Sequence, residues 1–306
     1  MDNKSLTVNV LLCTFNGERF LEEQLKSLSE QEGVEVRLHI SDDGSTDETL
    51  KIVKNFSDRL NMATPIQGPQ KGPAANFLSL ATKESISGQW FAFCDQDDIW
   101  EPGKLKRALE TLEPFHDTPA LYCSHSKIID GSGKIIGHSK RHTKPPSFRN
   151  AFVQNISSGH TMVFNAQARE LLMKAKPVEV RFHDWWLYIL VTFAGGKVIH
   201  DQNAFVRYRQ HDHNDIGPHA GWKGIQYRIR RLLAGTYRQW IGQHIDALEG
   251  VLELGTPEQR MSFEKLTLIH SQNFITRCGA LFGARFYRQT FLGQAALRVF
   301  ILIGKA

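Results

Sequence analysis

The alternation of strand-like and helix-like segments in the first 115 residues is the feature that most constrains the fold. Apolar runs of strand length occupy residues 8–13, 34–40, 62–66 and 90–94, and a segment with helical periodicity follows each run. Repeated β–α units of this kind are typical of a parallel sheet wound by helices. The sequence therefore predicts an α/β domain with a Rossmann-like, predominantly parallel sheet and flanking helices.

Polar loops directly follow three of these strands. They comprise residues 14–18, 42–46 and 95–98. In open parallel sheets, ligands bind beyond the carboxyl ends of the strands, so polar loops that share this edge indicate a ligand site. The alternative is that each loop only caps its own helix. That alternative explains each loop singly, but it does not explain why all three carry unusual polar chemistry.

The third loop places three carboxylates within four residues, Asp95, Asp97 and Asp98, at the end of an apolar strand. These groups repel one another and are costly to desolvate, so a positive partner must offset them. The period of two of an extended chain directs Asp95 and Asp97 to the same side. A divalent cation that holds a phosphorylated ligand is the natural candidate. A solvated acidic turn is the alternative.

Composition and charge narrow the class of protein. The net charge of +5 and the pI near 9.0 suit an anionic partner such as nucleotide phosphates, nucleic acid or an acidic membrane surface. The four cysteines have no metal-ligand spacing, so we expect them to be small core residues of a reduced protein. Neither an apolar signal core nor a membrane-spanning run is evident. We therefore expect a cytoplasmic protein, with the inner face of the cell membrane as a further location.

Two common nucleotide-binding motifs are missing from the sequence. No GxGxxG follows the first predicted strand, which disfavours a nicotinamide-dependent dehydrogenase. No GxxxxGK[ST] occurs, which disfavours a P-loop NTPase.

The rest of the chain divides into two predicted parts. Residues 120–129 and 159–165 are further predicted strands, and β patterns end near residue 217. We therefore predict an α/β domain at residues 1–217 and a helical C-terminal region, or appendage, at residues 218–306. Within that region, residues 284–303 combine bulky apolar side chains with arginine. This pattern fits a membrane-surface helix or a helical bundle packed on the domain, and a homodimer is left open as well.

A set of motifs then occurs in a fixed order: VNVLLCTFNGERFLEEQLKSL, LHISDDGSTDET, FAFCDQDDIW and FHDWWLYI. Together they resemble the motifs of family 2 glycosyltransferases, which have the GT-A fold. KGPAANFLSL, GHTMVFN, HDWW and YRQHDHN add a resemblance to bacterial rhamnosyltransferase-like members. The likeness covers residues 7–217, and the C-terminal helices resemble no family that we can assign.

The resemblance implies a metal-dependent inverting glycosyltransferase. Such an enzyme moves a sugar from a nucleotide-diphosphate donor to a glycan or lipid-linked saccharide acceptor in cell-surface polysaccharide biosynthesis. The candidate donor is dTDP-L-rhamnose. Two alternatives stay open: a UDP-hexose or UDP-N-acetylhexosamine donor, and a non-catalytic relative that binds a nucleotide or glycan. No nucleic-acid partner is expected, because the acidic loop opposes it and no basic run is interleaved with aromatic residues.

The resemblance also implies roles for individual residues. The donor-binding set comprises Thr14 and Phe15 beside the base, Asn16 and Glu18 in the same loop, Asp43 at the base, Asn76, Asp95 near the ribose, and Arg209, with Arg207, at the phosphates. Asp97 is the implied ligand of Mg²⁺ or Mn²⁺, with Asp95 or Asp98 helping directly or through water. His211 is a candidate further ligand or phosphate contact. Asp184 matches the position of the general base that accepts the proton of the acceptor hydroxyl.

Each of these roles has a plainer alternative. Asp184 could simply stabilise the positive N-terminal end of its helix. His211 could be a solvated loop histidine. Trp185 and Trp186 could stack on a sugar, although we expect one of them to be core. His183 replaces an acidic residue that many relatives have just before the base, which puts a dual-carboxylate role there in doubt.

Overall fold

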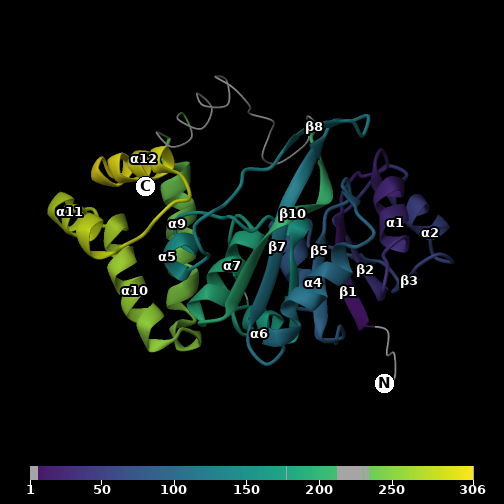
Figure 1. Ribbon diagram of the computed structural model, residues 1–306, viewed down its shortest axis with the longest axis horizontal. Coiled ribbons are helices and arrows are strands. Elements are labelled where there is room, and N and C mark those ends of the chain that lie inside the picture. The colour runs from purple at the N-terminus through teal and green to yellow at the C-terminus, as the bar shows by residue number, and fades with distance from the viewer. Residues whose placement is uncertain (1–5, 177, 212–229, 231–233, 306) are drawn as a thin grey trace.

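A computed structural model of the chain describes all residues except 1–5, 177, 212–229, 231–233 and 306. Its centre is a ten-stranded mixed sheet, with helices on both sides (Figure 1). The strands are β1 (Leu6–Thr14), β2 (Val34–Asp42), β3 (Asn61–Met62), β4 (Ile66–Gln67), β5 (Trp90–Cys94), β6 (Ile99–Trp100), β7 (Ala120–Ile129), β8 (Ile135–His138), β9 (Val163–Asn165) and β10 (Lys197–Arg209).

The helices lie between the strands and after the last of them. The α-helices are α1 (Leu21–Ser29), α2 (Thr49–Asn55), α3 (Pro73–Ala81), α4 (Lys104–Leu112), α5 (Phe148–Ala151), α6 (Ala166–Lys174), α7 (His183–Phe193), α9 (Thr236–Glu249), α10 (Pro257–Thr267), α11 (Phe274–Gly283) and α12 (Phe291–Leu302). Short 3₁₀ helices are η1 (Glu113–Phe115), η2 (Gly159–Thr161), η3 (Leu252–Leu254) and η4 (Leu268–His270).

The sheet consists of two parallel blocks joined by one short strand. Its order is β3-β2-β1-β5-β9-β7-β10-β6, with β4 added beside β2 and β8 beside β7. Strands β2, β1 and β5 run parallel, and so do β7 and β10. Strand β9 is antiparallel to both of its neighbours, β5 and β7. The predicted α/β class with a mostly parallel sheet is confirmed.

Both faces of the sheet are buried, which explains why its strands have continuous apolar sequences. In β1, Val8, Val10 and Leu12 pack in the core under α1, α2 and α4. Leu11 and Cys13 face the other core, which α3, α6 and α7 cover. This alternation follows from the period of two of an extended chain.

Two predicted strands differ from the structure. The strand expected at residues 62–66 is replaced by the two-residue strands β3 and β4, both paired to β2. The strand expected at residues 159–165 begins as the 3₁₀ helix η2, and only β9 is extended. The turn forms because Thr161 N donates to Ser158 O at 2.9 Å and Met162 N donates to Gly159 O at 2.9 Å.

The helices after β10 pack on the sheet domain and share its core. Ile241 of α9 and Leu266 of α10 are buried in the same hydrophobic cluster as α7. The Tyr237 hydroxyl donates to Val153 O at 2.7 Å. These contacts agree with the packed bundle, whereas the predicted domain boundary at residue 217 lies outside the described residues. In the described part of the chain, no helix is both long and apolar enough to cross a membrane.

Candidate active site

The three polar loops begin at the ends of adjacent strands. Strand β1 lies between β2 and β5, and all three are parallel. Thr14 is level with Asp42 in the sheet, and Leu12 is level with Cys94. The loops therefore leave the sheet at one edge, as the sequence predicted, and this edge is where open α/β sheets bind ligands.

The loop after β1 is cross-linked to the loop after β2. Thr14 Oγ1 donates to Asp42 Oδ1 at 2.7 Å. Asn16 Oδ1 accepts from Thr46 N at 2.9 Å, and Glu18 Oε2 accepts from Glu48 N at 3.0 Å. Asn16 has φ +47°, the left-handed conformation that asparagine tolerates better than most residues. These side chains build the edge of the site, while their predicted contacts with the donor stay predictions.

Phe15 is a large apolar residue of this loop that is 56% exposed. Gln96 holds the Phe15 backbone at both ends: Phe15 N donates to Gln96 Oε1 at 2.9 Å, and Gln96 Nε2 donates to Phe15 O at 2.9 Å. A Cβ on Gly17 would lie 2.3 Å from Gln96 Oε1, so a larger residue there would displace the Gln96 side chain from the Phe15 backbone. Gln96 was not among the predicted site residues, and the one local signal for it is its place between Asp95 and Asp97.

Asp43 and Asn76 organise the loop that follows β4. The Asp43 carboxylate accepts from Gln70 N at 2.6 Å and from Gly72 N at 3.0 Å. Buried Asn76 exchanges two hydrogen bonds with Ser41, one of them from Asn76 Nδ2 to Ser41 O at 3.0 Å. The carboxylate of Asp43 thus fixes a loop beside the predicted base site. The side-chain amide of Asn76 is hydrogen-bonded to Ser41 of β2.

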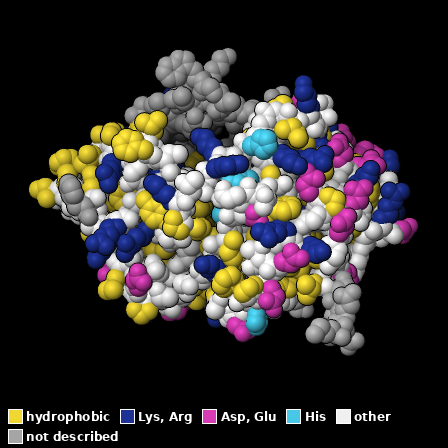
Figure 2. All heavy atoms as spheres, in the orientation of Figure 1, with side chains coloured by type: hydrophobic (Ala, Val, Ile, Leu, Met, Phe, Trp, Pro, Cys, Tyr) yellow, Lys and Arg dark blue, Asp and Glu magenta, His cyan; other side chains and the backbone are white. Residues whose placement is uncertain are grey.

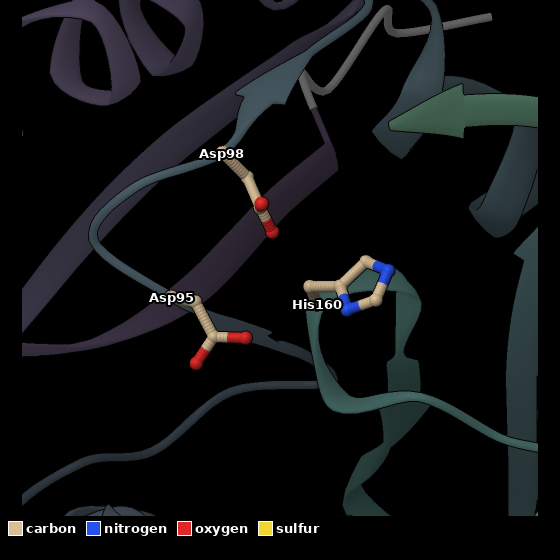
Figure 3. Close-up of side chains that lie close together, drawn as sticks. All are labelled: Asp95, Asp98 and His160. Carbon is tan, nitrogen blue, oxygen red and sulfur yellow. The ribbon is translucent and has the colours of Figure 1, made fainter. Parts of the chain in front are cut away.

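Two carboxylates of the acidic loop gather with a histidine that the sequence reasoning did not select. Ligand atoms of Asp95, Asp98 and His160 all lie within 4.8 Å of one another (Figure 3). His160 belongs to η2, and its Nε2 lies 2.8 Å from Ser126 Oγ. Burial lowers the pKa of His160 to about 3, with Lys104 adding to the effect, so the ring is neutral. A neutral imidazole and two carboxylates form a donor set that a divalent ion can use.

The charge that offsets the acidic loop comes partly from the protein itself. Asp98 is fully buried, and burial, then Asp97 and Asp95, raise its pKa. Lys104 is also fully buried, with Nζ 3.1 Å from the centre of the Trp100 ring, and burial lowers its pKa to about 7. Asp98 Oδ2 and Lys104 Nζ have no hydrogen-bond partner among the described residues. The positive partner that the sequence argument required is therefore in part a buried lysine.

Asp97 and His211, the metal ligands that the resemblance implies, lie in contact with each other. Their Oδ2 and Nε2 atoms are 2.7 Å apart, and the side chains are 16% and 14% exposed. A carboxylate oxygen and an imidazole nitrogen suit Mn²⁺, and partial exposure leaves room for phosphate or water oxygens. The two residues thus fit the metal role that the resemblance implies, and this role stays a prediction.

Arg209 is a fully buried clamp on the acidic loop. Its Nε donates to Asp97 O at 3.0 Å, and its Nη2 lies 2.8 Å from Glu23 Oε2. Its backbone N–H donates to Asp98 Oδ1 at 3.0 Å, and its guanidinium lies over the Phe20 ring. These contacts give Arg209 a structural role, and its predicted contact with donor phosphate stays untested.

Arg207 points to a different partner from the one expected. Its Nε and Nη2 lie 3.0 and 3.2 Å from the two Glu101 carboxylate oxygens. Lys127 Nζ also donates to this carboxylate and lies 2.8 Å from Glu101 Oε1. These contacts and the cations that make them lower the pKa of Glu101. Arg207 is thus engaged in a partly exposed ion-pair network at the end of the sheet.

Asp184 lies in the first turn of α7, and its carboxylate is held by backbone donors. Gly159 N donates to Asp184 Oδ2 at 3.0 Å, and Trp185 N donates to Asp184 Oδ1 at 2.6 Å. Burial nevertheless raises the pKa of Asp184 to about 6. A carboxylate with this pKa is ionised at neutral pH and can accept a proton, which suits a general base.

The residues around Asp184 are apolar core rather than sugar platforms. Trp185 and Trp186 are 4% and 0% exposed, so both are core residues, where only one was expected to be, and neither offers a stacking surface for a sugar. His183 stacks on Phe77 with the ring centres 4.0 Å apart, and burial lowers its pKa to about 3. Beyond Asp184, α7 is apolar nearly all round and lies inside the core, so neither tryptophan presents a ring face to a sugar.

The 3₁₀ helix η2 connects the two chemical groups of the site. Gly159 binds Asp184 through its backbone N–H, and the next residue, His160, joins the group with Asp95 and Asp98. A Cβ on Gly159 would lie 2.9 Å from His183 Nε2, so this close approach needs glycine. The general-base candidate and the acidic loop are therefore linked through adjacent residues.

Sequence comparison assigns the chain to a family. The model of the family described as "Glycosyl transferase family 2" matches residues 9–174, which is more than half of the 306 residues. The chain belongs to glycosyl transferase family 2. It is therefore a glycosyltransferase.

Two curated relatives illustrate the sequence likeness. A dTDP-rhamnosyl transferase, RfbG of Shigella flexneri, is 28% identical over 251 residues, which cover 78% of this chain and 84% of the relative. The poly(ribitol-phosphate) beta-N-acetylglucosaminyltransferase TarS of Staphylococcus aureus is 30% identical over 127 residues, which cover 41% of this chain and 22% of TarS.

Solved structures support the same fold. Residues 1–349 of TarS in complex with UDP-GlcNAc superpose with a TM-score of 0.55 at 18% identity, covering 89% of this chain and 83% of that one. The mannosyltransferase PcManGT of Pyrobaculum calidifontis, in complex with GDP-Man and Mn²⁺, gives 0.58 at 17% identity, covering 99% and 87%. The fold of this chain is GT-A-like.

Proposed function

We propose that this glycosyltransferase is a metal-dependent inverting enzyme that uses dTDP-L-rhamnose and a glycan or lipid-linked saccharide acceptor. The observation that carries the proposal is the connection through η2 between Asp184, whose pKa is raised to about 6, and the acidic loop. A proton acceptor beside a phosphate-binding edge is the arrangement that a single displacement at an anomeric carbon needs.

The donor would lie along the edge formed by the loops after β1, β2 and β5. The exposed Phe15 ring offers a stacking surface for the base. Asp43 is fixed by two backbone N–H groups close to that surface. Asp95 stands at the end of β5, where the ribose and diphosphate would follow.

Mg²⁺ or Mn²⁺ would be held by Asp97 and His211, with diphosphate oxygens as further ligands. When bound, such an ion neutralises negative charge that develops on the leaving nucleoside diphosphate. Asp95, Asp98 and His160 lie in the adjacent group. Lys104 is buried beside these carboxylates and offsets part of their charge.

Asp184 would act on the acceptor. Its carboxylate accepts the proton of the acceptor hydroxyl as that oxygen forms a bond to the anomeric carbon. The bond from the anomeric carbon to the diphosphate oxygen breaks, and the bonding electrons leave with the nucleoside diphosphate. Attack from the opposite face inverts the anomeric configuration. Backbone N–H groups of Gly159 and Trp185 keep the carboxylate oriented throughout.

The choice of dTDP-L-rhamnose rests on likeness to the Shigella flexneri dTDP-rhamnosyl transferase, which extends over 78% of this chain. The similar fold of TarS in complex with UDP-GlcNAc favours the second candidate, a UDP-sugar donor. Both candidates use the same proposed base and metal ligands, so the nucleotide distinguishes them.

A thermal-shift series tests the donor and the metal together. dTDP, UDP and GDP are each added with and without Mn²⁺, because a ligand that binds only the native state raises the melting temperature. We expect the largest shift with dTDP and Mn²⁺. His211→Ala should remove the Mn²⁺-dependent part of this shift, whereas His138→Ala, at an exposed position on β8, should keep it.

The possible results separate the alternatives. A larger shift with UDP would replace the rhamnose donor by a UDP-sugar. A shift that does not depend on Mn²⁺, or that survives in His211→Ala, would contradict the metal site. Nucleotide binding without sugar release from dTDP-L-rhamnose or any common UDP-sugar, in the presence of cell-envelope acceptors, would show a non-catalytic binding protein.

A further inference from the structure

Helices α11 and α12 carry the most exposed large apolar side chains of the described surface. Phe291, Leu292 and Ile275 are 84%, 79% and 78% exposed. Phe274 on α11 and Val299 on α12 are 57% and 55% exposed. Exposed apolar side chains that gather in one place mark an interaction surface, whereas scattered ones need no explanation.

Helix α12 has two apolar faces, and only one of them is covered. Leu297 and Ile301, four residues apart, are buried against the protein. Leu292, Val299 and Ile303 follow at spacings of seven and four residues, so they form a second stripe on the helix. This stripe is exposed along its whole length. An exposed apolar stripe opposite a buried one marks a surface of the helix that can bind a partner.

Helix α11 extends this surface at one end of α12. Arg277 of α11 donates through Nη2 to Leu302 O at 3.1 Å, which holds the start of α11 beside the end of α12. We call the combined surface the terminal apolar face. It consists of Phe274, Ile275, Phe291, Leu292, Val299 and Ile303.

The segment that carries the terminal apolar face is basic. No aspartate or glutamate occurs after Glu264 in the sequence. Arg285, Arg298 and Lys305 are exposed in the same segment. Figure 2 shows hydrophobic side chains with interspersed basic ones at the end of the molecule formed by α11 and α12, and most acidic side chains at the opposite end.

We propose that the terminal apolar face docks the protein on an anionic membrane surface, with α12 lying in the plane of the interface. Bulky apolar residues then enter the boundary between headgroups and acyl chains, and the arginines and the lysine bind lipid phosphates. A second copy of the chain fits this face less well, because it would bring the same exposed cations, Arg285, Arg298 and Lys305, close to one another. The proposal does not depend on the identity of the donor or acceptor.

Vesicle sedimentation of the full-length protein tests the proposal. The probes are vesicles of phosphatidylcholine alone and of phosphatidylcholine mixed with phosphatidylglycerol. We expect binding to the anionic vesicles, weakened by added salt because the electrostatic part is screened. The double variant Phe291→Ser and Leu292→Ser should bind about tenfold or more weakly, since it loses the two most exposed apolar side chains.

The matched control changes another adjacent pair of exposed apolar residues. Ile135 and Ile136 on β8 are 49% and 55% exposed, and β8 lies well away from α12 (Figure 1). Ile135→Ser with Ile136→Ser should leave vesicle binding unchanged. Equal melting temperatures of both double variants and the native protein show that folding is not the cause of a difference.

Three outcomes would overturn the proposal. The first is that the native protein binds neither kind of vesicle. The second is that the variant at Phe291 and Leu292 binds anionic vesicles as tightly as the control does. The third is a dimer in light scattering that the same variant dissociates, which would make this face an interface between copies of the chain.

Discussion

At the scale of single residues, the burial and contacts of each carboxylate decide whether it is suited to accept a proton, to stay protonated or to bind a metal ion. Asp184 is held by two backbone N–H groups, yet burial dominates and raises its pKa to about 6. Asp98 is buried more completely, so protonation is favoured there as well. Asp97 keeps 16% of its side chain exposed and faces His211. Three aspartates at one site are thus suited to different tasks.

The pH dependence of activity tests the role of Asp184. Because the ionised form accepts the proton, kcat/KM should fall about tenfold per pH unit below pH 6 and level off above it. Asp184→Asn should lower kcat by about 10²- to 10⁴-fold. Initial rates across pH, with Asp117→Asn at an exposed position as the control, provide the measurement. Near-native activity of Asp184→Asn would contradict the assignment.

The same pKa shift has a consequence for stability. The pKa of Asp184 rises from 3.8 to about 6 on folding, so the folded state binds the proton more tightly than the unfolded state does. This carboxyl group therefore makes folding less favourable as the pH rises from 4 to 6. The free energy of unfolding of the native protein should therefore fall relative to that of Asp184→Asn as the pH rises from 4 to 6, whatever constant cost the amide adds by replacing one acceptor oxygen. Urea unfolding of both proteins at pH 4 and at pH 7 measures this difference, and an unchanged difference would contradict the pKa shift.

At the scale of elements, the loop between β5 and β6 depends on a residue far along the chain. Arg209, at the end of β10, binds the backbone of Asp97 and the carboxylate of Glu23 on α1. Its own backbone N–H holds Asp98. The loop that carries the acidic residues is thus fixed between α1 and β10 rather than by its own sequence.

Replacing Arg209 tests this clamp. Arg209→Met should lower the free energy of unfolding by about 2–4 kcal/mol, because buried groups lose charged hydrogen-bond partners. Arg207→Met is the matched control: its side chain is 41% exposed, and an exposed ion pair contributes about 1 kcal/mol or less. Urea unfolding of both variants compares them. Equal stabilities would show that the buried guanidinium does not hold the loop.

At the scale of the whole molecule, the C-terminal helices and the sheet domain share one core. Ile241 on α9 and Leu266 on α10 are fully buried in the cluster that contains Trp186 and Leu190 of α7. The ring of Trp185 also contacts His244, with the ring centres 4.6 Å apart. We therefore expect the two predicted parts to unfold together, although the chain position that separates them stays a prediction.

A substitution on α9 measures this coupling. Ile241→Ala should lower the free energy of unfolding of the whole protein by about 2–4 kcal/mol, because it opens a cavity in the shared core. Ile275→Ala, at a position that is 78% exposed, should change it by about 0.5 kcal/mol or less. Urea unfolding followed by tryptophan fluorescence should show a single transition. Two separate transitions would indicate that the C-terminal helices fold independently.

The sequence by itself determined the features that depend on neighbouring residues. The strand–helix alternation predicts a parallel sheet, and the place of the polar loops after β1, β2 and β5 predicts the edge where they meet. Both rest on local periodicity, which a single sequence displays directly. The order of the motifs also indicated the glycosyltransferase family, because the loops after these strands carry residues typical of that family.

The tertiary structure decided which distant side chains complete the site. His160 joins Asp95 and Asp98 only because β9 pairs with β5 and brings η2 alongside. Lys104 looks like an ordinary first residue of an amphipathic helix until packing buries it. Burial and long-range contacts depend on how all elements pack, and no local pattern encodes them. The charge balance of the site was therefore visible only in the folded protein.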